Sequence, residues 1–169
     1  MSHETRNRCA YHAHGRIKRG TVPKNPLDLE TERRIFLEGI RLFNAGEFFE
    51  AHETWEEIWN LTLDKRREQF YRAIIQSAVT LELLRRGRAV GVRQVFVSCL
   101  DLFICLPEVF MGIDIAAHQE KLRHAIQPAL DDLETRHVQI DPSRLFQIEL
   151  QYDPFVESRA GENADGSAH

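Results

Sequence analysis

Apolar side chains recur at helical spacing through five successive segments of the chain, and capping residues, glycines and prolines separate these segments. The pattern predicts an all-α fold, a bundle of about five helices in which two antiparallel helical hairpins follow one another. The predicted helices span residues 28–44, 47–60, 65–86, 89–106 and 114–136.

Residues that begin and end helices set these bounds. Asp28 and Asp114 suit the N-cap position. Gly46 and Gly87 each follow a predicted helix end, where a left-handed backbone conformation favours glycine. Pro128 is expected to kink or split the fifth helix, because proline has no N–H to donate.

The ends of the chain are predicted to lie outside the bundle. Residues 1–26 form a flexible basic arm, residues 27–157 the helical domain and residues 158–169 a disordered tail. The arm could contact phosphates or simply be solvated. Within the domain, residues 140–155 are ambiguous, because Asp141-Pro142 suits either a turn or the start of a short helix.

The two predicted hairpins resemble each other. A shift of 41 residues places Gly46 on Gly87, and it also aligns apolar positions on both sides of the glycine. A helix, a glycine turn and a second helix are also the unit of tetratricopeptide-like hairpins. Because any two amphipathic hairpins share these features, the repeat supports only antiparallel packing.

The second helix carries the candidate chemistry. At about 100° per residue, Phe48, Trp55 and Trp59 share one face, and His52 falls within this stripe beside Trp59. Glu56 follows His52 by four residues, a spacing at which two side chains can meet. Such a pair could be a structural hydrogen bond, could bind a ligand or a metal ion, or could share a proton in catalysis.

Further polar residues could complete a site. Glu53 flanks the pair, and Gln76 and Glu82 interrupt the apolar sequence of the third helix, where either could face His52. Gln76 also suits an interhelical hydrogen bond, and Glu82 suits an ion pair with the arginines that follow it. The candidate ligand-binding residues are therefore His52, Glu53, Glu56, Gln76 and Glu82, with His52 and Glu56 as candidate metal ligands.

Other patterns are weaker. The H-E-x-x-E sequence at His52 lacks the second histidine of the zinc-protease motif. Cys9, His12 and His14 form an incomplete metal-binding set in the basic arm. Two further histidines, His118 and His124 on the fifth predicted helix, are expected to face solvent.

Composition narrows the class of protein. The apolar fraction of 43% and the charged fraction of 28% are near globular averages. A net charge of −4 gives no general attraction to nucleic acid or to an anionic membrane. Three scattered cysteines, no signal peptide and no apolar stretch long enough to span a bilayer predict a cytoplasmic protein.

One segment resembles a known family. Residues 43–53 (FNAGEFFEAHE), with Trp59 downstream, resemble the signature of the domain of unknown function numbered 309. Residues 74–78 (IIQSA) and 84–87 (LRRG) resemble its second block. The resemblance covers under half of the chain, and it implies an all-α bundle without an established activity. Relatives often carry a histidine where this chain has Glu82-Leu83, which argues against a metal site.

These observations favour a non-enzymatic helical module that binds a protein partner or a small ligand, because no complete catalytic set is found. The alternative is a metal-dependent or acid–base site centred on His52 and Glu56. The sequence names no cofactor, partner or ligand; a homo-oligomer stays open, and nucleic acid is not expected to bind. The predicted core consists of Phe43, Phe48, Trp55, Trp59, Ile74, Ala78, Leu81, Phe96 and Leu100.

Overall fold

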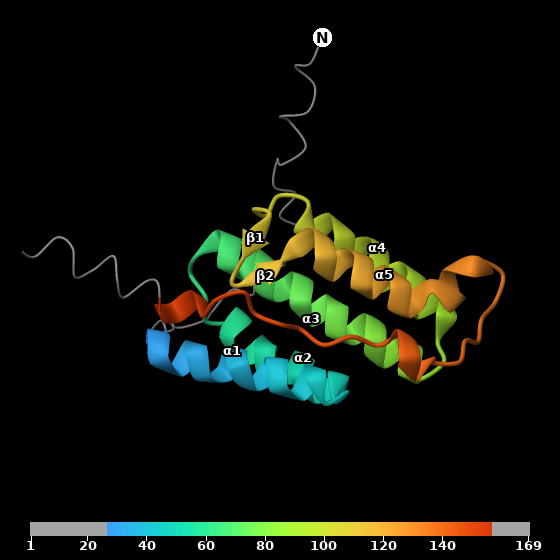
Figure 1. Cartoon of the computed structure of the whole chain (residues 1–169), viewed down its shortest axis with the longest axis horizontal. Coiled ribbons are helices and arrows are strands. Elements are labelled where there is room, and N and C mark those ends of the chain that lie inside the picture. The colour runs from blue at the N-terminus through green and yellow to red at the C-terminus, as the bar shows by residue number, and fades with distance from the viewer. Residues whose placement is uncertain (1–26, 157–169) are drawn as a thin grey trace, which may run out of the picture.

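Helices dominate residues 27–156, the part of the chain that the computed structural model describes (Figure 1). The helices are α1 (Leu29–Asn44), α2 (Phe48–Trp59), α3 (Lys65–Arg85), α4 (Ala89–Phe103), α5 (Ile115–Asp131) and the short 3-10 helix η1 (Pro142–Arg144). In sequence order α1 packs on α2, α2 on α3 and α3 on α4, and α5 contacts both α3 and α4. The predicted all-α bundle with two successive hairpins is confirmed. The predicted arm and tail lie outside the described residues, as do Cys9, His12 and His14.

Aspartates begin three of the helices. The carboxylates of Asp28, Asp64 and Asp114 accept the backbone N–H three residues further on, at 2.8–2.9 Å. Each bond satisfies an N–H that has no partner inside its helix. The predicted starts at Asp28 and Asp114 are therefore confirmed.

The turns that close α1 and α3 are built alike. Gly46 has φ +79° and Gly87 has φ +73°. After α1, the N–H groups of Gly46 and Glu47 donate to the carbonyls of Phe43 and Leu42, both at 3.0 Å. The same two bonds recur after α3, 41 residues further along. This arrangement requires a left-handed residue after the helix, which explains both glycines.

Two predicted helix ends are wrong, and side chains explain each. Helix α4 ends at Phe103 rather than at residue 106, and Gln69 of α3 donates to the Leu102 carbonyl at 2.6 Å. That bond satisfies an acceptor left over at the end of the helix.

Helix α5 ends at Asp131 rather than at residue 136. The Asp132 carboxylate accepts the N–H of Glu134 at 3.0 Å, and this local turn competes with further helix. Pro128 lies in the last turn of α5 and does not split it.

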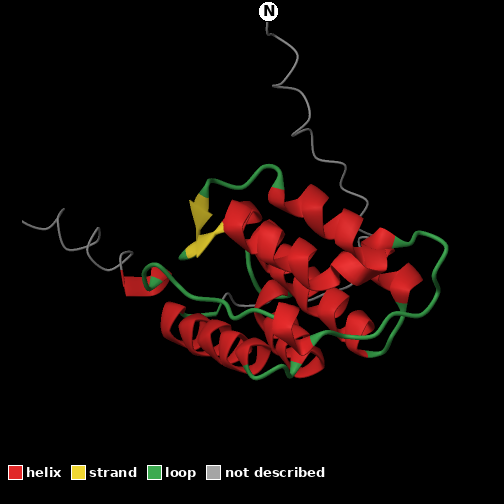
Figure 2. Cartoon of the chain, turned by 45° about the vertical axis from the view of Figure 1, so that its right-hand side comes forward, coloured by secondary structure: helices red, strands yellow, loops and turns green. Residues whose placement is uncertain are grey.

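A small β-hairpin links α4 to α5. Strands β1 (Val109–Phe110) and β2 (Ile113–Asp114) pair antiparallel (Figure 2). The turn between them holds Met111 at φ +51° and Gly112 at φ +77°, as a two-residue turn of this kind requires. The sequence predicts the turn around Gly112 but not the two strands.

Residues 145–153 form an extended segment, the strap, which runs between α1 and α5 across α3 (Figures 1 and 2). The Asn44 side chain exchanges two hydrogen bonds with the backbone of Ile148, at 2.7 and 3.0 Å. Arg33 of α1 pairs with Asp153 at 2.7 Å. Just before the strap, Asp141 caps η1, so the Asp141-Pro142 sequence starts a short helix after all.

The predicted core is buried except for Trp59 and Leu100, which are only partly buried against it. Trp55 is its centre: the ring is fully buried, and Nε1 donates to the carbonyl of Phe36 at 3.2 Å. Gly39 makes room for that ring, since a Cβ at this position would lie 2.1 Å from Trp55 Nε1. Within residues 27–156 no helix is long and apolar enough to cross a membrane.

Candidate ligand site between helices α2 and α3

Helix α2 turns a second face, beside its core face, toward α3. Phe49 marks the direction, because the guanidinium of Arg86, the C-cap residue of α3, lies 5.7 Å from the centre of its ring. On a helix, His52, Glu56 and Trp59 fall within an arc of about 80° that includes Phe49. All three are partly exposed. We call His52, Glu56 and Trp59, together with Gln76 of α3, the α2/α3 seam.

His52 bonds to its own helix rather than to Glu56. Its Nδ1 lies 2.5 Å from the carbonyl oxygen of Phe49, and the two rings meet edge to face at 4.9 Å. Because a carbonyl can only accept, Nδ1 donates in this contact, and in the neutral imidazole Nε2 then holds the lone pair. No residue that the structure describes bonds to that Nε2, so it is available to an external donor or a metal ion.

The neighbouring carboxylates differ in position. Glu53 is exposed, and Glu56 is partly exposed along the seam. In residues 27–156 the Glu56 carboxylate forms no ion pair or hydrogen bond. The structure therefore places Glu56 in the seam with an open acceptor and leaves Glu53 outside it.

Glu82 forms its hydrogen bonds with arginines and not with seam residues. Its buried carboxylate accepts from Arg85 at 2.7 and 2.8 Å and from Arg86 at 2.6 Å. The hydrogen bonds from Arg85, followed by those from Arg86, lower the pKa of Glu82. Glu82 is thus an ionised carboxylate in a local ion-pair cluster, the second of the two roles that its sequence position allows.

Two polar atoms of the seam are buried without a partner. Trp59 Nε1 and Gln76 Oε1 form no hydrogen bond with any described residue. A buried donor or acceptor left unpaired costs about 1–3 kcal/mol, so nearly all such groups in proteins are bonded. Each of these two atoms therefore marks a position where a hydrogen-bonding partner is missing.

The two atoms belong to different helices of one hairpin. Trp59 is the last residue of α2, and Gln76 lies eleven residues after Lys65, the first residue of α3. The seam thus has an unpaired donor on α2 and an unpaired acceptor on α3.

The described residues contain no group of three or more His, Cys, Asp and Glu side chains that could hold a metal ion. A catalytic zinc site uses three protein ligands and an open position. His52 and Glu56 supply two ligands at most.

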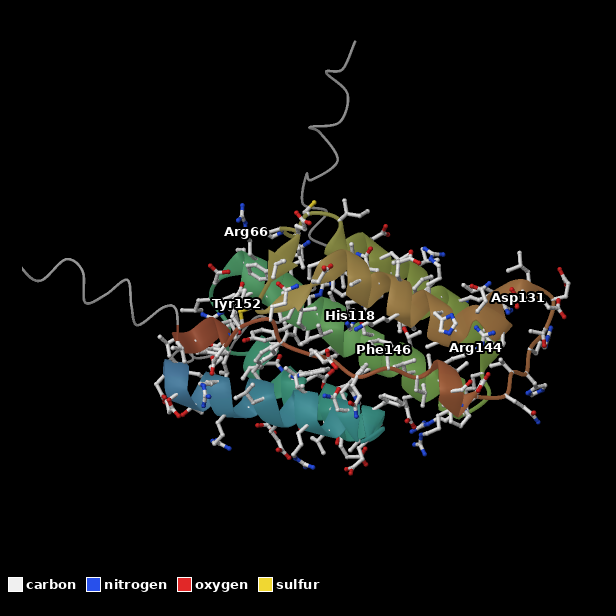
Figure 3. All side chains as sticks on the ribbon, viewed as in Figure 1. Arg66, His118, Asp131, Arg144, Phe146 and Tyr152 are labelled. Carbon is white, nitrogen blue, oxygen red and sulfur yellow. The ribbon has the colours of Figure 1, made fainter. Side chains whose placement is uncertain are left out.

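A histidine that the sequence placed in solvent is buried instead. His118 of α5 is 4% exposed and lies under Phe146 of the strap, with the two rings 5.4 Å apart (Figure 3). Its Nε2 lies 3.0 Å from Ser77 Oγ, which in turn contacts Cys99 Sγ at 3.3 Å. The prediction for His118 is wrong because the strap covers it. A signal was present: His118 stands three residues after Ile115, on the buried stripe of α5.

Burial decides the chemistry of this inner cluster. Desolvation, with Lys121 nearby as a smaller cause, lowers the pKa of His118 to about 4. Burial raises the pKa of the Cys99 thiol to about 12. A neutral imidazole and a protonated thiol suit a hydrogen-bonded core cluster and not a nucleophile.

Sequence reasoning also missed a carboxyl group inside the bundle. Glu32 of α1 is 6% exposed, accepts from the Tyr71 hydroxyl at 2.5 Å and pairs with Arg67 at 2.5 Å. Burial, followed by the charge of Glu32, raises the pKa of Tyr71 well above its usual value. No periodicity argument finds such a cluster, since Glu32 lies in the polar first turn of α1.

Known proteins resemble the part of the chain that contains the seam. Residues 36–95 match the family described as Domain of unknown function (DUF309), which confirms the resemblance seen in the sequence. An uncharacterized protein of Aquifex aeolicus is 31% identical over 93 residues. That match covers 54% of this chain and 28% of the Aquifex protein, so the chain spans well under a third of its relative. These findings support a helical domain without an assigned activity.

Proposed function

We propose that the domain is a non-enzymatic binding module that takes a small polar ligand at the α2/α3 seam, through a carboxamide-like edge. One observation carries the proposal: Trp59 Nε1 and Gln76 Oε1 are both buried with no partner among the described residues. A ligand that satisfies both atoms recovers the free energy that an unpaired donor and an unpaired acceptor cost.

The chemistry of the two atoms selects the ligand. An indole N–H needs an acceptor, and an amide oxygen needs a donor. A carboxamide or lactam supplies both groups, a carbonyl oxygen for the indole N–H and an N–H for the amide oxygen. His52 Nε2 and the Glu56 carboxylate lie along the same seam and accept further hydrogen bonds, so the ligand is expected to carry additional donors.

The family match supports this location. Residues 36–95 contain all four seam residues, whereas the inner His118 lies outside the match. A binding function shared by the family would have to use residues of the matched segment.

The experiment uses the two tryptophans of the chain as paired reporters. Each indole N–H gives one proton–nitrogen NMR signal, and Trp55 Nε1 is already bonded to Phe36, so it serves as an internal reference. Nicotinamide and 2-pyrrolidinone are titrated separately. Binding at the seam should move the Trp59 signal with saturation and leave the Trp55 signal in place.

Matched variants make the test specific. Gln76→Met keeps the shape of the side chain and removes the acceptor, so the Trp59 response should be lost or much weakened. Gln69→Met changes a glutamine of the same helix that bonds to Leu102, outside the seam, and should leave the response intact. A Trp59 signal that neither compound moves, or an equal response in Gln76→Met, would refute the proposal.

The metal-dependent or acid–base alternative rests on a different observation, the open Nε2 of His52 beside the unpaired carboxylate of Glu56. Elemental analysis of protein purified without a His-tag tests it, beside the variants His52→Ala and Glu56→Gln. Stoichiometric metal that is lost in both variants would favour this alternative over the binding module. Metal-free parent protein, with variants that are merely less stable, would reduce His52 and Glu56 to a structural pair.

A further inference from the structure

A shallow cavity of about 320 Å³, open to solvent over most of its extent, lies between α5 and the start of the strap, apart from the α2/α3 seam. Its lining residues are Glu120, Lys121, His124, Ser143, Arg144, Leu145 and Phe146. The volume falls within the range of small-molecule sites. All of these residues lie outside the family match, so the cavity is a feature of this chain beyond the shared segment.

The cavity favours an anion. Lys121 and Arg144 bring two positive charges, Glu120 is the one carboxylate among the described lining residues, and Asp141 pairs with Arg144 at its edge. Glu120 is also drawn toward Arg123, whose Nε lies 3.8 Å from its carboxylate. In the part of the chain that the structure describes, the Lys121 ammonium forms no hydrogen bond or ion pair, so all its donors are available to a ligand.

Arg144, a lining residue of the cavity, is held in place by two contacts. Its Nη1 donates to the carbonyl of His124 at 3.2 Å, and its Nε lies 3.4 Å from the Asp141 carboxylate. A guanidinium has five N–H donors, and these contacts leave several of them for an anion. A charge fixed before binding loses little freedom when the ligand arrives.

Phe146 gives the cavity a fixed apolar wall. Its ring packs against Phe43 at 5.5 Å and against His118 at 5.4 Å, so its position is set by the core of the bundle. Leu145 adds a second apolar contact. A cationic edge beside an aromatic wall suits a ligand that has an anionic head and a flat apolar body.

We propose that this cavity binds a phosphate monoester of a small aromatic group, with the phosphate between Lys121 and Arg144 and the aromatic body against Phe146. A phosphate dianion can bond to both cations at once, because its oxygens point in several directions, and charge-assisted bonds of this kind are strong. This proposal does not depend on the function proposed for the seam.

The test titrates phenyl phosphate into the full-length protein by isothermal calorimetry and by NMR of the backbone amides of residues 143–146. Saturable one-to-one binding is expected, weakened by added salt. Inorganic phosphate lacks the aromatic body, phenol lacks the anion and benzoate has a single negative charge, so each should bind at least about tenfold more weakly.

Variants separate the cavity from general charge. Lys121→Met and Arg144→Gln should each weaken phenyl phosphate about tenfold or more. Lys121 has no described partner, so its loss leaves the fold intact and keeps the test decisive even if Arg144→Gln destabilises the strap. Arg66→Gln is the matched control, because Arg66 is an exposed arginine at the start of α3, away from the residues that line the cavity (Figure 3).

Four results would overturn the proposal. They are the absence of saturable binding, an unchanged affinity in Lys121→Met, an equal loss in Arg66→Gln, and benzoate binding as tightly as phenyl phosphate. The first three reject the site, and the fourth rejects the phosphate as its ligand.

Discussion

Helix α2 carries two tryptophans, and they differ in burial and in hydrogen bonding because they lie on different sides of the helix. On the α1 side, Trp55 is fully buried, its N–H bonds to Phe36, and Gly39 makes space for its ring. On the α3 side, the ring of Trp59 is partly exposed and its N–H is buried without a partner among the described residues. The α1 side is a packed core in which the indole N–H is bonded, whereas the seam has polar atoms whose hydrogen bonds are left for a ligand. The difference teaches that one amphipathic helix can serve stability on one flank and binding on the other.

The two histidines repeat this contrast. His118 is buried, bonded to Ser77 and held neutral by its surroundings. His52 is partly exposed and keeps an open Nε2. Substitution of polar groups that are fully hydrogen-bonded inside the bundle should therefore lower the free energy of unfolding strongly, whereas substitution of seam groups should change it little.

The largest effect is expected from Trp55→Ala. The substitution removes a fully buried indole and leaves a cavity next to Gly39, which should lower the free energy of unfolding by about 3–5 kcal/mol. Urea denaturation followed by circular dichroism measures the change. A variant as stable as the parent would show that the α1 side is not the core.

The next effect concerns pH and His118. The pKa of His118 is about 4 in the folded protein and 6.5 in its ordinary environment, so the unfolded chain binds the proton more readily between these values. Stability is therefore complete above pH 6.5 and falls as the pH drops toward 4, by about 3 kcal/mol in total. Denaturation midpoints measured across this range test the prediction.

Two histidine variants of α5 give this pH prediction its control. His118→Phe should be less stable than the parent and should lose most of the dependence on pH between 6.5 and 4. His124→Gln, which changes an exposed histidine, should keep the dependence. The same slope in His118→Phe as in the parent would contradict the assignment.

A smaller effect is expected where α1 meets Trp55. In Gly39→Ala the new Cβ would lie 2.1 Å from Trp55 Nε1, so the ring must move at a cost of about 1–3 kcal/mol. Gly91→Ala is the matched control, because its Cβ would meet only the flexible end of Leu83 at 3.2 Å. Thermal unfolding should show a lower midpoint for Gly39→Ala than for Gly91→Ala, and the reverse order would disprove the close packing.

The sequence predicts local features of this fold better than long-range ones. Caps such as Asp28 and turns such as Gly46 are found because their signals lie within a few residues. The strap and the β-hairpin depend on contacts between segments far apart in the chain, such as the Asn44–Ile148 pair. His118 was misplaced for the same reason, since the Phe146 that covers it lies on the strap.

The candidate site was predictable to a similar extent. Periodicity places His52, Glu56 and Trp59 on one side of α2, and the structure keeps them together. It separates Glu53 from the seam, and it places Glu82 in ion pairs with Arg85 and Arg86. Which polar atoms lack a partner depends on side-chain geometry across two helices, and no sequence pattern carries that information.

The smallest effect is the sharpest test of the comparison, and it uses two glutamines of α3. Gln69 donates to the Leu102 carbonyl at 2.6 Å, whereas Gln76 Oε1 is buried without a partner in the described structure. Gln69→Met keeps the shape and removes a hydrogen bond, which should lower the free energy of unfolding by about 1 kcal/mol.

Gln76→Met also keeps the shape of the side chain, but the acceptor that it removes forms no hydrogen bond in the described structure. Its free energy of unfolding should stay within about 0.5 kcal/mol of the parent or rise by up to about 1 kcal/mol. Urea titrations of both variants, made without added ligand, measure the difference. A seam glutamine that proved as costly to replace as Gln69 would mean that Oε1 already has a partner, such as a buried water. The polar atoms on both sides of α2 would then all be bonded, and the argument for a ligand at the seam would fail.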